Sequence, residues 1–381
     1  RNKYNTAAMV LLPHRVRLTI IIISYFLPLN HAKAITAFLV RSSIMDAPAK
    51  MPRAATRAAT TTRMPAASCF PNSISSHSFS LSAVSSDYKN GSIKVTRQKG
   101  GTEQEYDLSY RIHNPMRLSS QQAAPLLVLH GGPGVPSDYL YPLSEVVPYR
   151  SIVFFDQLGC GRSPVNDDSS DAEDADPDIF SIDLSLDDLE LLIHKLGLRQ
   201  FHLYGQSFGG ILAFEYLKRI SEGKSNFDDS KCLSVILSST PTNVSQVETT
   251  ANQLMSSLKD EDDDESTLTE RFRVEHQCRT LERPQPLLDA YNHAGTVWRG
   301  TESISDWEAV QPAADAARMP SAMVLRGEHD FVTEDCVEEW KSHFNHNFVR
   351  LKVLQGCSHH GLLENGKMYG DLVDSFLSEY D

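Results

Sequence analysis

Eight segments of the chain carry the short apolar runs that are typical of β-strands, and three others have apolar residues at helical spacing. The predicted strands are 92–99, 105–113, 125–130, 151–157, 201–206, 233–239, 322–327 and 348–354. The predicted helices are 182–197, 208–220 and 367–380. Strands that alternate with helices indicate a mostly parallel central sheet with helices on both faces. The predicted fold class is therefore α/β.

The segment 241–318 interrupts this alternation and is helical in tendency, with QVETTANQLMSSL followed by STLTERFRVEHQCRTL. We predict a helical lid there, inserted between a first core part, 87–240, and a last core part, 319–381. Two acidic runs, seven acids in 167–178 and six in 260–265, are interpreted as solvated loops. They lack the glycine-punctuated spacing of a calcium loop.

The first 86 residues differ from the rest and are interpreted as a targeting presequence, absent from the folded domain. Arg15 and Arg17 precede an apolar run at 18–29, and a tail rich in Ser, Thr, Ala and Arg follows up to residue 86. This order resembles the signal-plus-transit presequences of algae with complex plastids, so we expect a plastid location, with cytoplasmic or secretory locations as alternatives. A membrane anchor or an incorrect gene start is the other interpretation. After processing we expect no stable membrane insertion.

The net charge argues against nucleic acid as a partner, and the cysteine spacing argues against a metal site. Residues 1–86 hold ten Lys/Arg and one acid, which leaves 26 Lys/Arg against 48 Asp/Glu, a net −22, in the remainder. A body this acidic repels phosphate backbones, so nucleic acid is not an expected partner. The six cysteines have no C-x-x-C or metal-like spacing and are interpreted as free thiols. We predict no cofactor and no metal.

A candidate nucleophile stands in a G-x-S-x-G pattern, Gly205 to Gly209, between a predicted strand and a predicted helix. Such a strand–turn–helix projects the Ser207 hydroxyl above the sheet. The first turn of the helix adds unpaired N–H groups and a positive dipole end beside that oxygen. The alternative is a glycine-rich packing turn.

A serine hydroxyl needs a base, which in turn is oriented by an acid. The loop after 322–327 reads GEHD and ends at Asp330, and the loop after 348–354 reads GCSHH. We assign Asp330 as the acid and His359 as the base, with His360 as the alternative base. The alternative acids are Glu328 and Asp335. The histidines interpreted as surface or structural groups are His329, His343 and His346.

An acyl-transfer site also needs N–H donors for the anionic intermediate. The sequence HGGPG at 130–134 follows a predicted strand, where such a donor belongs. We assign the donors to the backbone N–H groups of Gly132 and Phe208. The alternative for HGGPG is a purely structural turn.

Three motifs, HGGPG at 130–134, DQLGCGRS at 156–163 and GQSFGG at 205–210, together resemble the proline iminopeptidase family of the α/β hydrolases. The resemblance covers about residues 92–381. It implies an α/β-hydrolase fold and release of an N-terminal residue, typically proline, from short peptides without a metal. Carried over by position, it implies a Ser207, Asp330 and His359 triad, with Gly132 and Phe208 forming the oxyanion hole.

One departure affects the expected substrate. The family binds the substrate amine with two glutamates, whose positions here are Phe331 and, ten residues before Trp307, Val297. Either another glutamate, Glu302, Glu328 or Glu334, replaces them, or the substrate is a neutral acyl compound and the protein is an esterase or amidase. A non-catalytic receptor of the same fold is a third hypothesis. The candidate substrate-binding residues are Glu302, Phe331 and Trp298.

Overall fold

The computed structural model describes most of the chain after residue 86. The described ranges are 87–119, 122–165, 176–227, 229–260, 263–295, 298, 300–344 and 348–381, without the side chain of Glu302. The presequence hypothesis and most of the 167–178 acidic run lie outside them.

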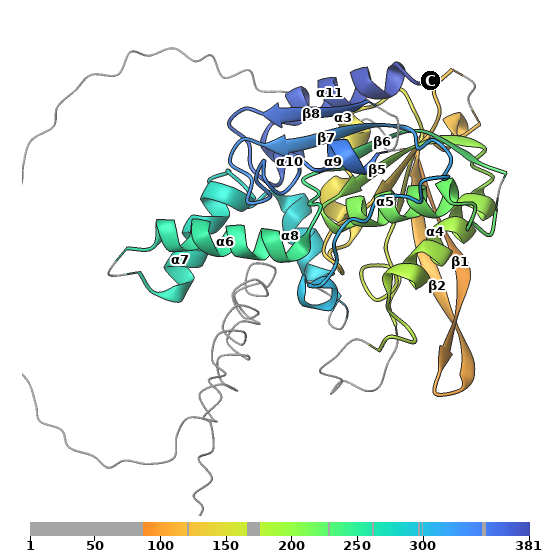
Figure 1. The fold of residues 1–381 in the computed structure, drawn as a ribbon, viewed down its shortest axis with the longest axis horizontal. Coiled ribbons are helices and arrows are strands. Elements are labelled where there is room, and N and C mark those ends of the chain that lie inside the picture. Colours follow the sequence, from red (N-terminus) through yellow and green to blue (C-terminus); the bar gives the residue numbers. More distant parts are fainter. Residues whose placement is uncertain are drawn as a thin grey trace, which may run out of the picture. The chain divides into compact units, whose positions relative to one another are not determined.

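The described residues form one eight-stranded sheet in the order β1-β2-β4-β3-β5-β6-β7-β8 (Figure 1). Its strands are β1 (Tyr88–Lys99), β2 (Thr102–His113), β3 (Leu126–Leu129), β4 (Ile152–Phe155), β5 (Gln200–Gln206), β6 (Lys231–Ser238), β7 (Ser321–Gly327) and β8 (Val349–Leu354). β2 is antiparallel to β1 and β4, and the strands from β4 to β8 pair in parallel. The predicted fold class is confirmed.

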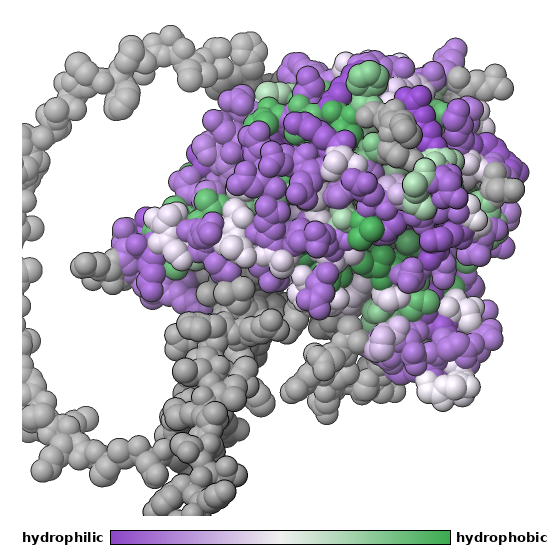
Figure 2. Space-filling model, viewed as in Figure 1, coloured by the Kyte–Doolittle hydropathy of each residue, from purple (hydrophilic) through white to green (hydrophobic). Residues whose placement is uncertain are grey.

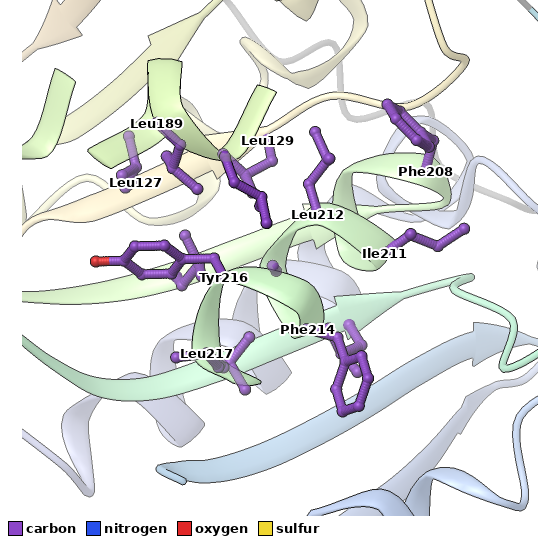
Figure 3. Close-up of a cluster of buried hydrophobic side chains, with 14 of the residues drawn as sticks. Leu127, Leu129, Leu189, Phe208, Ile211, Leu212, Phe214, Tyr216 and Leu217 are labelled. Carbon is purple, nitrogen blue, oxygen red and sulfur yellow. The ribbon is translucent and has the colours of Figure 1, made fainter. Parts of the chain in front are cut away.

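Alternating side chains of the central strands enter two separate hydrophobic cores. In β3, Leu127 and Leu129 pack with α4 (Ile182–Leu196) and α5 (Phe208–Ser221), as Figure 3 shows. Leu126 and Val128 face the other core, which contains side chains of α3 (Leu143–Val146) and α11 (Gly366–Ser378). Because both faces are covered, these short strands are apolar throughout.

The ends of the first long helix follow from local sequence. The Ser181 hydroxyl accepts a hydrogen bond from the Leu184 N–H at 3.2 Å, which caps the start of α4. Gly197 closes the helix in the left-handed conformation, with φ 64°. The predicted helix 182–197 therefore matches the observed one.

The segment between β6 and β7 contains the helices of the predicted lid. They are α6 (Val244–Leu258), α7 (Glu265–Phe272), a π-helical turn η3 (Arg273–Gln277), α8 (Gln285–Asn292) and the 3-10 turn η4 (Glu302–Ile304). Ala251, Met255 and Phe272 form a small core of their own between α6 and α7. The other short elements are η1 (Pro115–Arg117), η2 (Ser137–Leu140), α9 (Trp340–His343) and α10 (Gly361–Glu364).

The largest departure from the sequence prediction is the length of the first hairpin. β1 begins at Tyr88 and β2 at Thr102, several residues earlier than predicted, and the two pair from Tyr88↔His113 to Lys99↔Thr102. The residues added at the two strand starts, 88–91 and 102–104, are exposed or half-buried, so they show no apolar alternation that a sequence pattern could reveal.

The surface in Figure 2 is mainly hydrophilic, with smaller apolar patches, as expected for helices that turn their apolar sides to the sheet. None of the described helices combines the length and apolar character that crossing a bilayer requires.

Candidate active site

Ser207 occupies the sharp turn between β5 and α5. Its backbone has φ 54° and ψ −118°, a conformation that a non-glycine residue adopts only under strain. A Cβ atom on Gly205 would overlap the backbone of Gly209, and one on Gly209 would overlap the carbonyl of Leu129. The Ser207 N–H donates to the Ser238 carbonyl at 2.8 Å. Glycines on both sides therefore let the turn close while the serine stays at the carboxyl edge of the sheet.

Asp330 and His359 meet at that same edge, from the loops after β7 and β8. His359 Nδ1 donates to Asp330 Oδ1 at 2.8 Å, and both side chains are buried. Oδ1 also accepts from the Val332 N–H at 2.9 Å, which fixes the carboxylate. In the neutral ring this bond places the proton on Nδ1, so Nε2 of His359 is the acceptor.

His360 has a different environment. Its imidazole is buried edge-on against Tyr139, and burial lowers its pKa well below the usual value. Nε2 of His360 has no hydrogen-bond partner among the described residues. The alternative acid Glu328 instead accepts from the Gly356 N–H at 2.8 Å. The structure thus pairs Asp330 with His359 and not with His360.

Ser207 lines a cavity whose wall includes Phe331 and Val332, the two residues that follow Asp330 in the chain. The described residues include no hydrogen bond from Ser207 Oγ to either His359 or His360. Phe331 stacks on the His359 ring at a centroid distance of 4.3 Å and lines the cavity together with Ser207. Catalytic hydrogen bonds are often long before substrate binds and shorten in the complex.

The lid is joined to the loop that carries the histidines. The N–H groups of His359 and His360 donate to the carbonyls of His276 and Gln277, at 3.3 and 3.0 Å. His276 Nδ1 donates to the carbonyl of His329 at 2.8 Å. The π-helical turn η3 therefore joins the segment between β6 and β7 directly to the loops that carry Asp330 and His359, and π-turns are often found at functional sites.

Gly132 and Phe208, whose backbone N–H groups are the predicted oxyanion donors, line the same cavity as Ser207. Gly132 has φ 120°, and a Cβ there would lie 2.5 Å from the Gly134 nitrogen, so only glycine fits. Neither N–H donates to an acceptor in the part of the chain that the structure describes. Unpaired donors beside a serine hydroxyl suit a developing oxyanion.

A buried hydrogen-bond chain that sequence reasoning missed holds the Gly132 loop. The Gly131 N–H donates to the Tyr139 hydroxyl at 2.8 Å, and that hydroxyl donates to Gln206 Oε1 at 2.7 Å. His130 Nε2 accepts from the Gln157 N–H at 2.9 Å, and its Nδ1 lies 2.9 Å from the Gly131 carbonyl. Burial lowers the pKa of His130, which keeps the ring neutral.

The DQLGCGRS motif has a structural role beside this loop. Asp156 accepts from the N–H groups of Ser137, at 3.0 Å, and Arg162, at 2.9 Å. Arg162 also pairs with Asp138 at 3.0 Å. The Asp156 carboxylate thus joins the segment after HGGPG to the segment after β4. The motif therefore stabilises the Gly132 loop by hydrogen bonds to its neighbouring segment.

The cavity has an open space of about 680 Å³, including solvent at its mouth, and most of its lining is apolar. The apolar lining side chains are Ile211, Pro241, Val244, Val247, Ala251, Phe272, Ile304, Phe331 and Val332. The polar ones from the lid are Glu248, Gln277 and Thr301. Glu248 Oε1 accepts from the Thr301 hydroxyl at 2.9 Å. Sequence reasoning missed Glu248, because one acid on an amphipathic helix carries no local signal.

The three predicted substrate-binding residues have different outcomes. Phe331 lines the cavity. Trp298 does not: it is buried edge-on against Phe208 and stacked on Phe180, and it lines a neighbouring groove instead. The side chain of Glu302 lies outside the described residues, as does Val297.

Two other features concern metals and thiols. No group of three or more His, Cys, Asp or Glu side chains within the described ranges is arranged to hold a metal ion. The described cysteines are free thiols: Cys160, Cys232, Cys278, Cys336 and Cys357.

Residues 126–369, more than half of the chain, match the model of the alpha/beta hydrolase family. The chain belongs to the alpha/beta hydrolase family. Within that family its similarity is to proline iminopeptidases. The proline iminopeptidase of Saccharolobus solfataricus is 27% identical over 285 residues, which cover 67% of this chain and 84% of the relative. That of Lactobacillus helveticus is 26% identical over 303 residues, covering 72% and 96%.

A solved structure shows the same alpha/beta hydrolase fold. The crystal structure of the Mycobacterium smegmatis proline iminopeptidase has a TM-score of 0.61 and 23% identity, and the match covers 76% of this chain and 98% of that one. The predicted family resemblance is confirmed, and the chain is a hydrolase of this fold.

Proposed function

We propose that this alpha/beta hydrolase is a serine hydrolase that releases an N-terminal residue, proline or another apolar one, from short peptides. One observation carries the proposal. Asp330 holds Nδ1 of His359, and that ring stacks on Phe331 in the wall of a cavity lined by Ser207, Gly132 and Phe208, the last two with unpaired N–H groups. The proline iminopeptidase relatives support the substrate class.

In the proposed reaction, Ser207 Oγ attacks the substrate carbonyl while His359 Nε2 accepts the hydroxyl proton. The N–H groups of Gly132 and Phe208 stabilise the resulting oxyanion. Collapse of the intermediate breaks the peptide bond, and the leaving amine takes the proton from His359. Water then repeats the sequence on the acyl-enzyme, with His359 again as the base. Asp330 holds the ring and stabilises the imidazolium.

The missing Ser207–His359 hydrogen bond is expected to form when substrate fills the cavity. Phe331 stacks on the His359 ring and lines the cavity, so a substrate that packs against Phe331 can shift the His359 ring toward Ser207. Exclusion of water by the substrate would also strengthen the bond.

The test compares three substrates with protein that begins after residue 86: prolyl-2-naphthylamide, its N-acetylated form and p-nitrophenyl acetate. The proposal expects turnover of the free-amine substrate in preference to the acetylated one, and loss of all turnover in Ser207→Ala. Turnover of the ester alone would reject the peptidase assignment and retain the serine hydrolase.

An esterase or amidase acting on a neutral acyl group is the second candidate. It is favoured by Phe331, an aromatic side chain where the related family has an amine-binding glutamate, and by the apolar lining of the cavity. On this candidate the N-acetylated amide and the ester are the better substrates, so the same three compounds separate the two functions.

A further inference from the structure

Glu248 is the one acidic or basic side chain among the described residues that line the cavity. It lies on α6, the first lid helix, next to Val247 and within one turn of Val244 and Ala251, which line the same wall. Pocket walls that are mainly apolar use their few polar groups to select and orient the ligand. A carboxylate in this position is therefore expected to favour substrates that carry a positive charge.

The contacts of Glu248 leave its charge available. Oε1 accepts from the Thr301 hydroxyl at 2.9 Å, whereas Oε2 accepts no hydrogen bond from the described residues. No Lys, Arg or His within the described ranges forms an ion pair with it. Thr301 is neutral, so it orients the carboxylate without cancelling the charge. An apolar, partly closed site strengthens the attraction of such a carboxylate for a ligand cation.

The other candidate glutamates with described side chains, Glu328 and Glu334, have polar partners outside the cavity. Glu328 accepts from the Gly356 N–H, and Glu334 is an exposed side chain that pairs with Arg326 at 3.3 Å. Neither lines the cavity. Glu248 lines that cavity together with Ser207, Gly132 and Phe208, so a ligand that fills the cavity borders both the carboxylate and the serine.

We propose that Glu248 is the specificity-determining residue, which binds the positively charged amine of the substrate while the acyl carbonyl lies at Ser207. This inference rests on the proposed function and names its substrate class: an acyl group with an apolar body and a protonated amine next to the carbonyl. The apolar wall contacts the body, and the Glu248 carboxylate receives the N–H groups of the amine. A neutral acyl group of the same size gains only the apolar contact.

The first test measures kcat/KM for prolyl-2-naphthylamide and for p-nitrophenyl acetate in Glu248→Gln. The glutamine side chain has the same shape as the glutamate and can still accept the Thr301 hydrogen bond, but it carries no negative charge. Loss of a charge-assisted hydrogen bond should lower the amine-to-ester ratio of kcat/KM by about 10- to 100-fold. Glu265→Gln is the matched control, because Glu265 is an exposed lid carboxylate at the start of α7, and its ratio should equal that of the wild type.

A second test does not need peptide turnover. At pH 7, pyrrolidine is a cation of the size of a proline ring, and it should inhibit hydrolysis of p-nitrophenyl acetate by the wild type. Tetrahydrofuran, its neutral analogue, should inhibit far less. Glu248→Gln should weaken pyrrolidine inhibition by about tenfold or more, whereas Glu248→Asp, which keeps the charge, should retain most of it.

The outcomes separate the two proposals. If neither substrate is hydrolysed by the wild type, the proposed function fails. If the wild type hydrolyses the amine substrate and Glu248→Gln lowers both activities equally, Glu248 is only structural and the inference is overturned while the function stands. Ester turnover that pyrrolidine does not inhibit also overturns it. Glu248→Asp answers the question should Glu248→Gln fail to fold.

Discussion

The two sides of the cavity are built differently. On the sheet side, the Gly132 loop, the Ser207 turn and the Asp330–His359 pair are fixed by buried hydrogen bonds of 2.7–2.9 Å. On the lid side, apolar side chains form the wall, and Glu248 and Thr301 supply one polar pair. A reaction needs atoms held to fractions of an ångström, whereas selection needs only a wall of the right shape and charge. We infer that the sheet side carries the chemistry and the lid side the choice of substrate.

Removal of the proposed nucleophile should have the largest effect, because it should abolish the chemistry of the sheet side and leave substrate binding by the lid side intact. Ser207→Ala should lower kcat by about 10⁴- to 10⁶-fold, because no other group can form the acyl-enzyme. The fold and substrate binding should remain, since alanine also fits the turn. Steady-state rates and thermal melting check this. Residual activity near that of the wild type would place the nucleophile elsewhere.

The histidine pair offers a matched comparison on the sheet side. His359→Ala should lower kcat by about 10²- to 10⁴-fold through loss of the base, whereas His360→Ala should stay within about tenfold. Asp330 is hydrogen-bonded to the first ring and not to the second. If the order of the two effects is reversed, the base is His360 and the observed pairing is misleading.

A buried histidine that does not line the cavity should make the folding stability of the domain fall in acid. Burial lowers the pKa of His202, on β5, to about 4. Between the usual histidine pKa near 6.5 and that value, the unfolded chain binds a proton that the folded chain does not. Stability is therefore complete above about pH 6.5 and falls toward pH 4, and between pH 7.5 and 5.0 the loss should be about 2 kcal/mol for this group. Urea unfolding of the wild type and His202→Gln measures it, and an equal pH difference in both would disprove the assignment.

Removal of the Tyr139 hydroxyl, which accepts from the Gly131 N–H, should lower kcat less than the changes above. Tyr139→Phe removes the acceptor of the Gly131 N–H and the donor to Gln206, so kcat should fall by about tenfold, less than for loss of a direct donor. Tyr204→Phe is the control, because it removes a buried hydrogen bond to Tyr369 and leaves both hydrogen bonds of the Tyr139 hydroxyl in place. Both variants should lose stability, but only Tyr139→Phe should slow the reaction. Equal rates would show that the loop is fixed by other contacts.

Sequence patterns were informative where the chemistry is local. The turn at Ser207 depends on glycines beside it and on a strand and a helix at either side, all within a dozen residues. HGGPG likewise follows its strand directly. Local patterns therefore place Ser207 and the Gly132 loop at the carboxyl edge of the sheet, where the structure has them.

Contacts between distant segments could not be predicted in this way. Two adjacent histidines look alike in sequence, and it is the position of the Asp330 carboxylate that distinguishes them. Tyr139 and Gln206 are far apart in the chain, and their hydrogen bond follows from the packing of η2 beside β5. Glu248 was overlooked for the same reason, because only the tertiary fold brings that face of α6 to the cavity that Ser207 lines.

The finest test removes one methyl group from each side of the cavity. Ile211 lines it from α5 and Ile304 from the lid, and both are buried. Ile304→Val should change the kcat/KM ratio of p-nitrophenyl butyrate to acetate by about four- to fivefold, since one methylene in an apolar pocket is worth about 0.8–1 kcal/mol. Ile211→Val should instead cost about 0.5–1.5 kcal/mol of folding stability with a smaller change in that ratio, because α5 packs into the main core. If both variants shift selectivity equally, the division between a fixed sheet side and a selective lid side is wrong, and the cavity acts as one uniform wall.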